Sequence, residues 1–263
     1  MLVAGLCIMG ASLFGVLFTT SFARRFLETR LSFLVSFSSG VFLVTASALA
    51  LEVFEIFTGG VVFGITFILV GYGLAWVVEL LIPESHHHHD PHQHDGHAHD
   101  KVGARKLLIG DGIHNIGDGI MLAPAFLVSP TLGLAVTVSV FIHETLQGIS
   151  EFFVLKQAGY SSARAISLNF LTNGTILVGI VLSYFALASQ GFEGILLALS
   201  CGFFIHVVVH DLLPRPSAHE NVQQFFYHVI VVAVGLVLMA LVSEAVSEVG
   251  HTRAESEALV PIP

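Results

Sequence analysis

Eight apolar segments dominate the 263-residue chain, and each is close to the ~20 residues that an α-helix needs to cross a bilayer. Of all residues 54% are apolar and only 11% are charged. Mean hydropathy is +0.85, far above that of a water-soluble domain. The chain is therefore predicted to be an all-α polytopic membrane protein that forms one transmembrane domain over residues 1–263, and an ordinary soluble enzyme is excluded. The predicted spans are Leu2–Ser21, Leu31–Leu51, Gly59–Ile82, Leu107–Val128, Thr131–Leu155, Ser162–Ala188, Gly194–Leu213 and Gln224–Ser243.

The charge balance and the cysteines exclude two further classes of protein. A net charge of −9 leaves no basic surface with which to bind nucleic acid. Cys7 and Cys201 both lie inside apolar segments, and their spacing indicates neither a disulfide framework nor a thiolate metal site.

The basic residues indicate how the chain is oriented. The first segment lacks a charged leader and is followed by Arg24 and Arg25, so a retained helix is expected rather than a cleaved signal peptide. In an eight-span arrangement nine of the ten Lys and Arg residues fall on one side of the membrane and only Arg253 falls on the other. The positive-inside rule therefore places both termini outside a plasma or inner membrane. The basic residues on the cytoplasmic side are Arg24, Arg25, Arg30, Lys101, Arg105, Lys106, Lys156, Arg164 and Arg215.

A short sequence match suggests an internal repeat between the two ends of the chain. Two helices separate the first three helices from the last three, so the two groups of three must have opposite orientations in the membrane. The segment around Gly40 and Phe42 matches the segment around Gly202 and Phe204. This pattern predicts an inverted repeat of helices 1–3 and 6–8 around helices 4 and 5, an arrangement typical of transporters.

Polar side chains inside the apolar segments are the main functional candidates, because an ionisable group in a bilayer is costly unless it is paired or faces a cavity. The fourth segment carries four such residues at i, i+3, i+4 and i+7, which share one helix face. The fifth segment carries a second set on one face. The two sets are Asp111, His114, Asn115 and Asp118, and His143, Glu144, Gln147 and Glu151.

Each of these two helices thus presents an imidazole, carboxylates and an amide, a donor set that suits zinc and, less well, iron, manganese or cobalt. The absence of a thiolate argues against a tight structural zinc site. The alternative is that the groups satisfy one another as interhelical hydrogen bonds. A zinc protease motif of the form His-Glu-x-x-His fails at Gln147.

Direction along the helices suggests the two ends of a pathway. Asp111, Glu151, His210 and Asp211 are expected near the cytoplasmic end, where they would line an exit. Glu52 is expected near the outer entry. His206, His228, Asn169 and Asn173 are interpreted first as interhelical packing contacts.

A histidine-rich segment joins the third and fourth spans. Its composition cannot bury a core, so residues 84–104 are predicted to be a disordered cytoplasmic loop. Closely spaced neutral imidazoles form weak, interchangeable sites for zinc-like ions, which indicates that the loop buffers or senses metal; an inert linker is the alternative. The loop histidines are His86, His87, His88, His89, His92, His94, His97 and His99.

Taken together, these motifs closely resemble the ZIP (zinc- and iron-regulated transporter-like) family. The resemblance rests on His114-Asn115-x-x-Asp118-Gly119, on His143-Glu144, on the histidine-rich loop and on the eight spans. The stretch from Gly202 to Pro214 also looks like the family's seventh helix.

The resemblance implies a two-metal site between helices 4 and 5. One metal would be held by His114, His143 and Gln147, and the other would be held or bordered by Asn115, Asp118 and Glu144. Three departures from the family pattern bear on the site. Leu146 replaces a proline, which should leave helix 5 straight; Gly148 replaces a carboxylate; and Glu52 stands where the family has a His-Leu-Leu-Pro-Glu entry motif.

The expected function is therefore import of zinc toward the cytoplasm, with iron, manganese, cobalt or cadmium as further substrates and the bilayer and divalent ion as partners. No Walker-type loop is present, so no nucleotide and no enzymatic activity are expected. Glycine-rich helix faces permit a homodimer. The alternatives from other classes are an intramembrane zinc hydrolase and a metal sensor that does not transport.

We predict that deletion of the segment His86–His99 leaves zinc flux largely intact and changes its dependence on cytoplasmic zinc, because the segment lies outside the predicted spans. Flux at several internal zinc concentrations checks this. Complete loss of flux would place the loop in the pathway.

Overall fold

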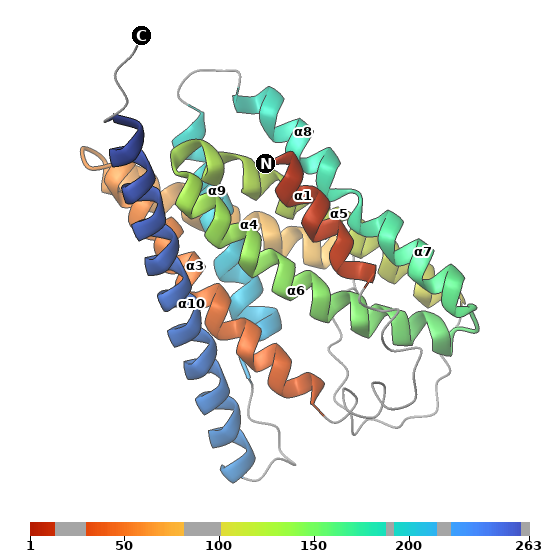
Figure 1. Ribbon diagram of the computed structural model, residues 1–263. Coiled ribbons are helices and arrows are strands. Elements are labelled where there is room, and N and C mark those ends of the chain that lie inside the picture. Colours follow the sequence, from red (N-terminus) through yellow and green to blue (C-terminus); the bar gives the residue numbers. More distant parts are fainter. Residues whose placement is uncertain (14–29, 82–100, 188–191, 215–221, 259–263) are drawn as a thin grey trace.

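The computed structural model describes residues 1–13, 30–81, 101–187, 192–214 and 222–258, and every regular element in these ranges is a helix (Figure 1). The histidine-rich segment lies outside them. The elements are α1 (Leu2–Ala11), α3 (Leu31–Ile56), α4 (Val61–Leu81), α5 (Lys101–Val128), α6 (Pro130–Gln157), α7 (Ser162–Asn173), α8 (Ile176–Leu187), α9 (Glu193–Val207), the π-helical turn η2 (Val208–Leu212) and α10 (Val222–Ala258).

Six stretches of the described chain are long and apolar enough to cross a membrane: α3, α4, α6, α7 with α8, α9 with the start of η2, and α10. α5 has sufficient length, 28 residues, but its polar face and basic first turns lower its hydropathy. The chain is thus an all-α polytopic membrane protein, as the sequence predicts. Large apolar side chains are exposed along α4 and along the part of α10 from Val222 to Val242.

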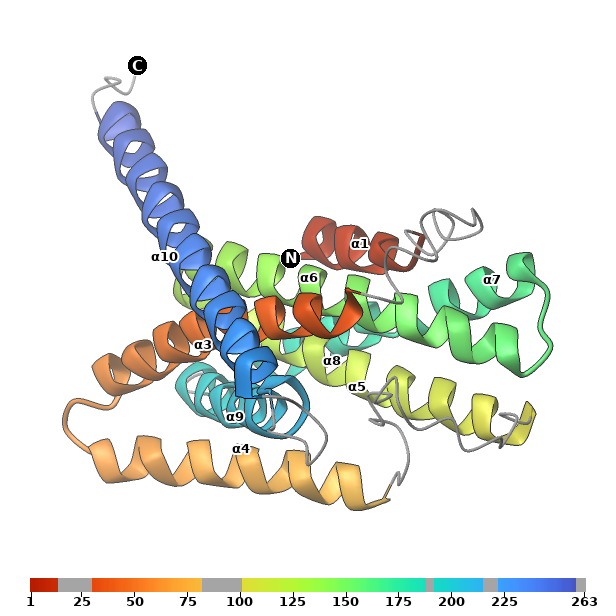
Figure 2. The same cartoon turned by 90° about the horizontal axis from the view of Figure 1, so that it is seen from below.

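α5 and α6 run side by side through the middle of the bundle (Figures 1 and 2). α1, α7 and α8 pack on one flank of this pair, and α3, α9, α4 and α10 lie on the other. α3 and α9 each contact the central pair, whereas α4 lies against α9 and α10 lies mainly against α3. The polar faces of α5 and α6 are therefore enclosed from both sides.

Glycines allow three helix pairs to touch backbone to backbone. Gly40 of α3 lies against the α10 backbone at Gly235, and Gly119 of α5 lies against α8 at Gly179. Between α4 and α9, a Cβ atom on Gly202 would lie 2.6 Å from the backbone nitrogen of Tyr72. Small residues permit such close approach, which strengthens helix packing where no hydrophobic driving force exists.

These contacts follow the internal symmetry that the sequence predicts. The second, third, seventh and eighth predicted spans are α3, α4, α9 and α10, so the predicted repeat makes α3 equivalent to α9 and α4 equivalent to α10. The α3–α10 pair is then equivalent to the α9–α4 pair, and Gly40 and Gly202 occupy the matching close contacts. Phe42 and Phe204, the other matched residues, stack on each other with ring centroids 4.8 Å apart. Equivalent residues of two repeats meet in this way when they lie beside the symmetry axis.

The helices differ from the predicted spans in three places. α5 begins at Lys101, six residues before the predicted Leu107, because helical hydrogen bonding continues where hydropathy falls. The predicted sixth span is divided at Gly174 and Thr175 into α7 and α8, and the Thr175 hydroxyl donates to the Gly112 carbonyl oxygen at 2.7 Å. α10 extends to Ala258, beyond the predicted Ser243.

We predict that Gly202→Ala lowers the thermal stability of the protein in detergent, at a cost of about 1–3 kcal/mol, because the new methyl group meets backbone that cannot rotate away. Gly73→Ala is the matched control, since no atom lies within 4 Å of its Cβ position. Helix propensity should make that control neutral or stabilising by up to about 1 kcal/mol. Equal melting temperatures for the two variants would contradict the close contact.

Candidate metal centre

The candidate site lies where the polar faces of α5 and α6 meet. α6 starts at Pro130, after Ser129, whose hydroxyl accepts the backbone N–H of Leu132. It then runs without interruption to Gln157, as expected for a helix with Leu146 in place of proline. Gly159, with φ of 84°, follows its C-terminus. α6 thus carries the whole polar set past α5 on one continuous helix.

The two predicted helix faces are both buried. On α5, all four predicted polar residues have almost no exposed surface, and on α6 only Gln147 is partly exposed. The 3.6-residue periodicity thus predicts correctly which sides of α5 and α6 face the interior of the bundle.

Three side chains form the centre of the site: His114, His143 and Glu144. One nitrogen of each imidazole and one carboxylate oxygen all lie within 4.8 Å of one another. His114 Nε2 is 4.0 Å from Glu144 Oε1 and 3.9 Å from Asp118 Oδ2. Two nitrogens and an oxygen, with a second carboxylate beside them, make a donor set for a divalent metal ion.

A hydrogen-bonded amide and carboxylate network adjoins this centre. The Gln147 side-chain nitrogen donates to Asp111 Oδ1 and, at 3.4 Å, to Glu151 Oε1. Asn115 donates to the same Asp111 oxygen at 3.1 Å. Glu144 therefore lies with the two histidines in the compact group, and the Gln147 amide nitrogen is directed to Asp111 and Glu151.

Negative charge is concentrated in this part of the bundle. Asp111 and Glu151 both accept from the Gln147 amide nitrogen, and Asp118 and Glu144 both lie within 4.0 Å of His114 Nε2. All four carboxylates are at most 3% exposed. Among the described residues, no Lys or Arg lies within 4.0 Å of them.

Aromatic rings bound the centre on the flank formed by α3 and α9. The ring of Phe42 lies 5.2 Å from that of His143, and the ring of Phe203 lies 6.1 Å from that of His114, measured between centroids. These apolar walls exclude water and lower the local dielectric, which strengthens electrostatic interactions at the site.

The structure separates the four predicted exit residues. Asp111 and Glu151 lie together in the network with Gln147, whereas His210 lies in η2, where it stacks on His206 and hydrogen-bonds to Tyr72. Asp211 also belongs to η2, but the placement of its side chain and of all eight loop histidines lies outside the described residues.

Two of the residues interpreted as packing contacts do join helices. His228 Nδ1 of α10 is 2.7 Å from the hydroxyl of Ser36 on α3, and Asn169 donates to the Gly148 carbonyl oxygen at 2.7 Å. Asn173 is buried on α7. Glu52, predicted at the entry, is partly exposed near the end of α3, where the charge of Glu55 acts on it.

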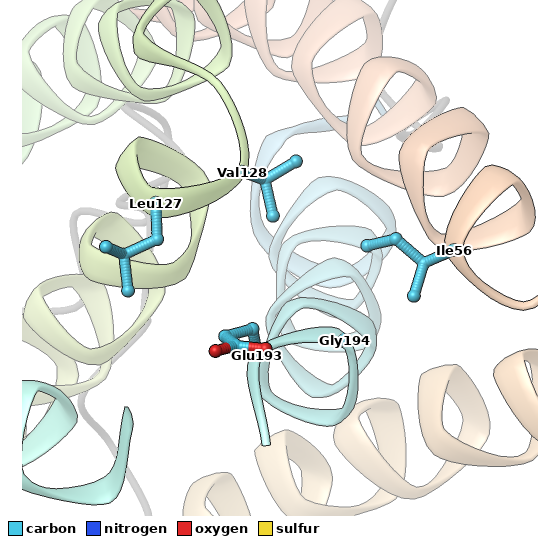
Figure 3. A pocket seen from close by; sticks show the side chains of 5 residues that line it. All are labelled: Ile56, Leu127, Val128, Glu193 and Gly194. Carbon is cyan, nitrogen blue, oxygen red and sulfur yellow. The ribbon is translucent and has the colours of Figure 1, made fainter. Parts of the chain in front are cut away.

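A cavity of about 330 Å³ opens between the ends of α3, α5 and α9 (Figure 3). It is lined by Ile56, Leu127, Val128, Glu193 and Gly194. These residues lie at the ends of the helices opposite the basic first turns of α5. Sequence reasoning missed Glu193, although an acidic residue at the start of an apolar helix is a recognisable signal.

Known proteins match the part of the chain that includes α5 and α6. The family model described as ZIP Zinc transporter matches residues 78–243, a range that contains both polar helix faces. The chain is 30% identical over 138 residues to "Zinc transporter foi" of Drosophila melanogaster, which covers 52% of this chain and 20% of that protein. It is 33% identical over 136 residues to "Zinc transporter ZIP4" of Homo sapiens, covering 52% and 21%.

A third relative, "Zinc transporter zipt-7.1" of Caenorhabditis briggsae, is 27% identical over 156 residues, which is 54% of this chain and 40% of that protein. The chain thus spans from a fifth to two fifths of the length of these relatives. Because the family model covers well over half of the chain, the chain belongs to the ZIP zinc transporter family.

Proposed function

We propose that this protein transports zinc across a membrane through the site between α5 and α6. The observation that carries the proposal is the group of four buried carboxylates, two of them beside a pair of histidines, with no Lys or Arg within 4.0 Å in the described part of the chain. Buried carboxylates are strongly unfavourable unless a cation or a proton neutralises them. A divalent cation fits this charge and this donor set.

In this proposal His114, His143 and Glu144 hold the ion, and Asp118 balances its charge. Asp111, Asn115, Gln147 and Glu151 border the site and offer oxygen ligands for a second ion or for the next step of passage. Imidazole and carboxylate donors favour zinc and also accept iron, manganese, cobalt or cadmium. No thiolate takes part, so the ion can leave again.

We further propose that ions pass toward the cytoplasm. The cavity beside Glu193 and the nearby Glu52 supply an acidic outer entry, and the basic loops mark the inner side. An inside-negative potential favours this direction by about 2.3 kcal/mol per elementary charge per 100 mV, and by twice that for a divalent ion. The exposed apolar faces of α4 and α10 would contact lipid.

The relatives' names, all of which read zinc transporter, support this function over the two alternatives. An intramembrane zinc hydrolase would bind zinc and activate water without moving the ion. A metal sensor would bind zinc without flux. Flux across a sealed membrane therefore distinguishes the transporter from both.

We predict saturable zinc uptake into sealed proteoliposomes, reported by a zinc-sensitive dye inside the vesicles. Glu144→Ala should reduce uptake at least tenfold, because loss of a direct ligand should exceed the 10- to 100-fold effects seen for groups that only orient ligands. Glu55→Ala is the matched control, since Glu55 is exposed near the end of α3. It should transport normally.

Two outcomes would contradict the proposal. Stoichiometric zinc binding without uptake, in protein that elutes as a folded species, would indicate the hydrolase or the sensor. Equal uptake by the Glu144→Ala variant and the unaltered chain would move the pathway away from α5 and α6.

We also predict that zinc raises the melting temperature of the detergent-solubilised protein. At a zinc concentration 100 times the dissociation constant, binding adds about 2.7 kcal/mol to the free energy of unfolding. Glu144→Gln should remove most of this gain, yet should stabilise the metal-free protein because one buried charge disappears. Glu55→Gln should do neither. Zinc bound by the histidine-rich loop is common to all variants and cancels in the comparison.

A further inference from the structure

A second group of metal-binding side chains lies on α4, α9 and η2, away from the site already described. It consists of Glu79, His206 and His210, and one donor atom of each lies within 4.8 Å of the others. We propose that these three residues form a separate site for a zinc-like divalent cation. Sequence reasoning placed His210 in an exit path and missed Glu79, the single acidic residue of the apolar helix α4.

The distances in the group suit a metal ion. His206 Nε2 and Glu79 Oε2 are 3.2 Å apart. Zinc bonds of about 2.0–2.1 Å in tetrahedral geometry place neighbouring ligand atoms about 3.3 Å apart. This nitrogen and oxygen therefore have the separation of two ligands on one ion, without a shift of either helix.

The group also has a residue that can orient a ligand. The Tyr72 hydroxyl is 2.8 Å from His210 Nε2. When Nε2–H donates to that hydroxyl, the ring is held in the tautomer whose Nδ1 carries the lone pair for a metal; metal-binding histidines usually donate their other ring N–H to a partner in this way. Tyr72 lies on α4 seven residues before Glu79, so both residues occupy one face of that helix.

Local helix geometry brings the two histidines together. His206 lies one residue before the end of α9, and His210 lies in the π-helical turn η2, where Leu213 N–H donates to the Val208 carbonyl oxygen. The two rings stack with centroids 4.4 Å apart. π-helical turns occur frequently at functional sites.

The position of the group along α9 links it to the first site. Phe203 contacts His114, and His206 and His210 follow three and seven residues later on the same helix face. At 1.5 Å per residue they lie about 4.5 and 10.5 Å farther along the helix, toward its C-terminal end. The proposed role is to receive an ion that leaves the α5–α6 site. That role rests on the proposed transport, whereas binding of the ion does not.

The test uses the full chain with Glu79→Cys in a Cys7→Ser background, because Cys7 is exposed and Cys201 is buried. Thiolate, with two imidazoles, binds Cd²⁺ strongly. We expect Cd²⁺ to protect the introduced thiol from a maleimide reagent in detergent, and we expect His206→Ala or His210→Ala to abolish the protection. Leu80→Cys is the matched control, since Leu80 is exposed beside Glu79 and outside the group. It should react equally with and without Cd²⁺.

Tyr72→Phe provides a second measurement. It should raise the Cd²⁺ concentration needed for half-protection by about 10- to 100-fold, the range for loss of an orienting partner. Protection should survive Glu144→Gln, which removes a ligand of the first site only. Loss of zinc uptake together with intact Cd²⁺ protection in this variant would show that the second site binds metal independently of the first.

Two results would overturn the proposal. One is failure of Cd²⁺ to protect the thiol of the Glu79→Cys variant in protein that elutes as a folded species. The other is protection that persists when both His206 and His210 are replaced, because the ion would then be held by other groups, such as the histidine-rich loop.

Discussion

The arrangement of this protein depends on negative charge that is buried without a basic partner. Asp111, Asp118, Glu144 and Glu151 lie on two adjacent helices in the middle of the bundle, and His114 lies within 4.0 Å of two of them, Asp118 and Glu144. Such a cluster in a low-dielectric interior is costly without a compensating cation. A structural salt bridge would have removed this cost permanently. Because the described residues hold no Lys or Arg within 4.0 Å of these carboxylates, protons or, in the proposed function, a transported divalent ion would neutralise them.

The helices around the cluster show how the fold tolerates this cost. Three glycine contacts join α3 to α10, α4 to α9 and α5 to α8 with no side chain between their backbones. In contrast, α5 and α6 meet through the polar side chains of the site. Stability thus comes from the close outer pairs, and the central seam can serve metal binding. If α5 and α6 moved relative to each other, none of these three close backbone contacts would have to break.

Periodicity predicted the fold and the buried polar faces, because hydropathy and 3.6-residue spacing depend on each helix alone. Pairings between helices could not be predicted in this way. The hydrogen bond from the Gln147 amide nitrogen to Asp111, for example, joins α6 to α5. Glu79 and His206 looked unrelated in sequence, and only the packing of α4 on α9 brings them together. The break at Thr175 depends likewise on a carbonyl of a neighbouring helix.

If the proposed transport and the proposed second site are both correct, the chemistry of the two donor groups favours two binding sites of moderate strength in succession over one very strong site. Each group contains two imidazoles and a carboxylate, and neither contains a thiolate. Passage requires that an ion bind well enough to enter and weakly enough to leave, which several moderate sites achieve better than one strong site. Phe203 contacts the His114 ring, and the face of α9 that carries Phe203 also carries His206 and His210. In the proposed pathway an ion would therefore pass Phe203 along α9 between the first ligand set and the second.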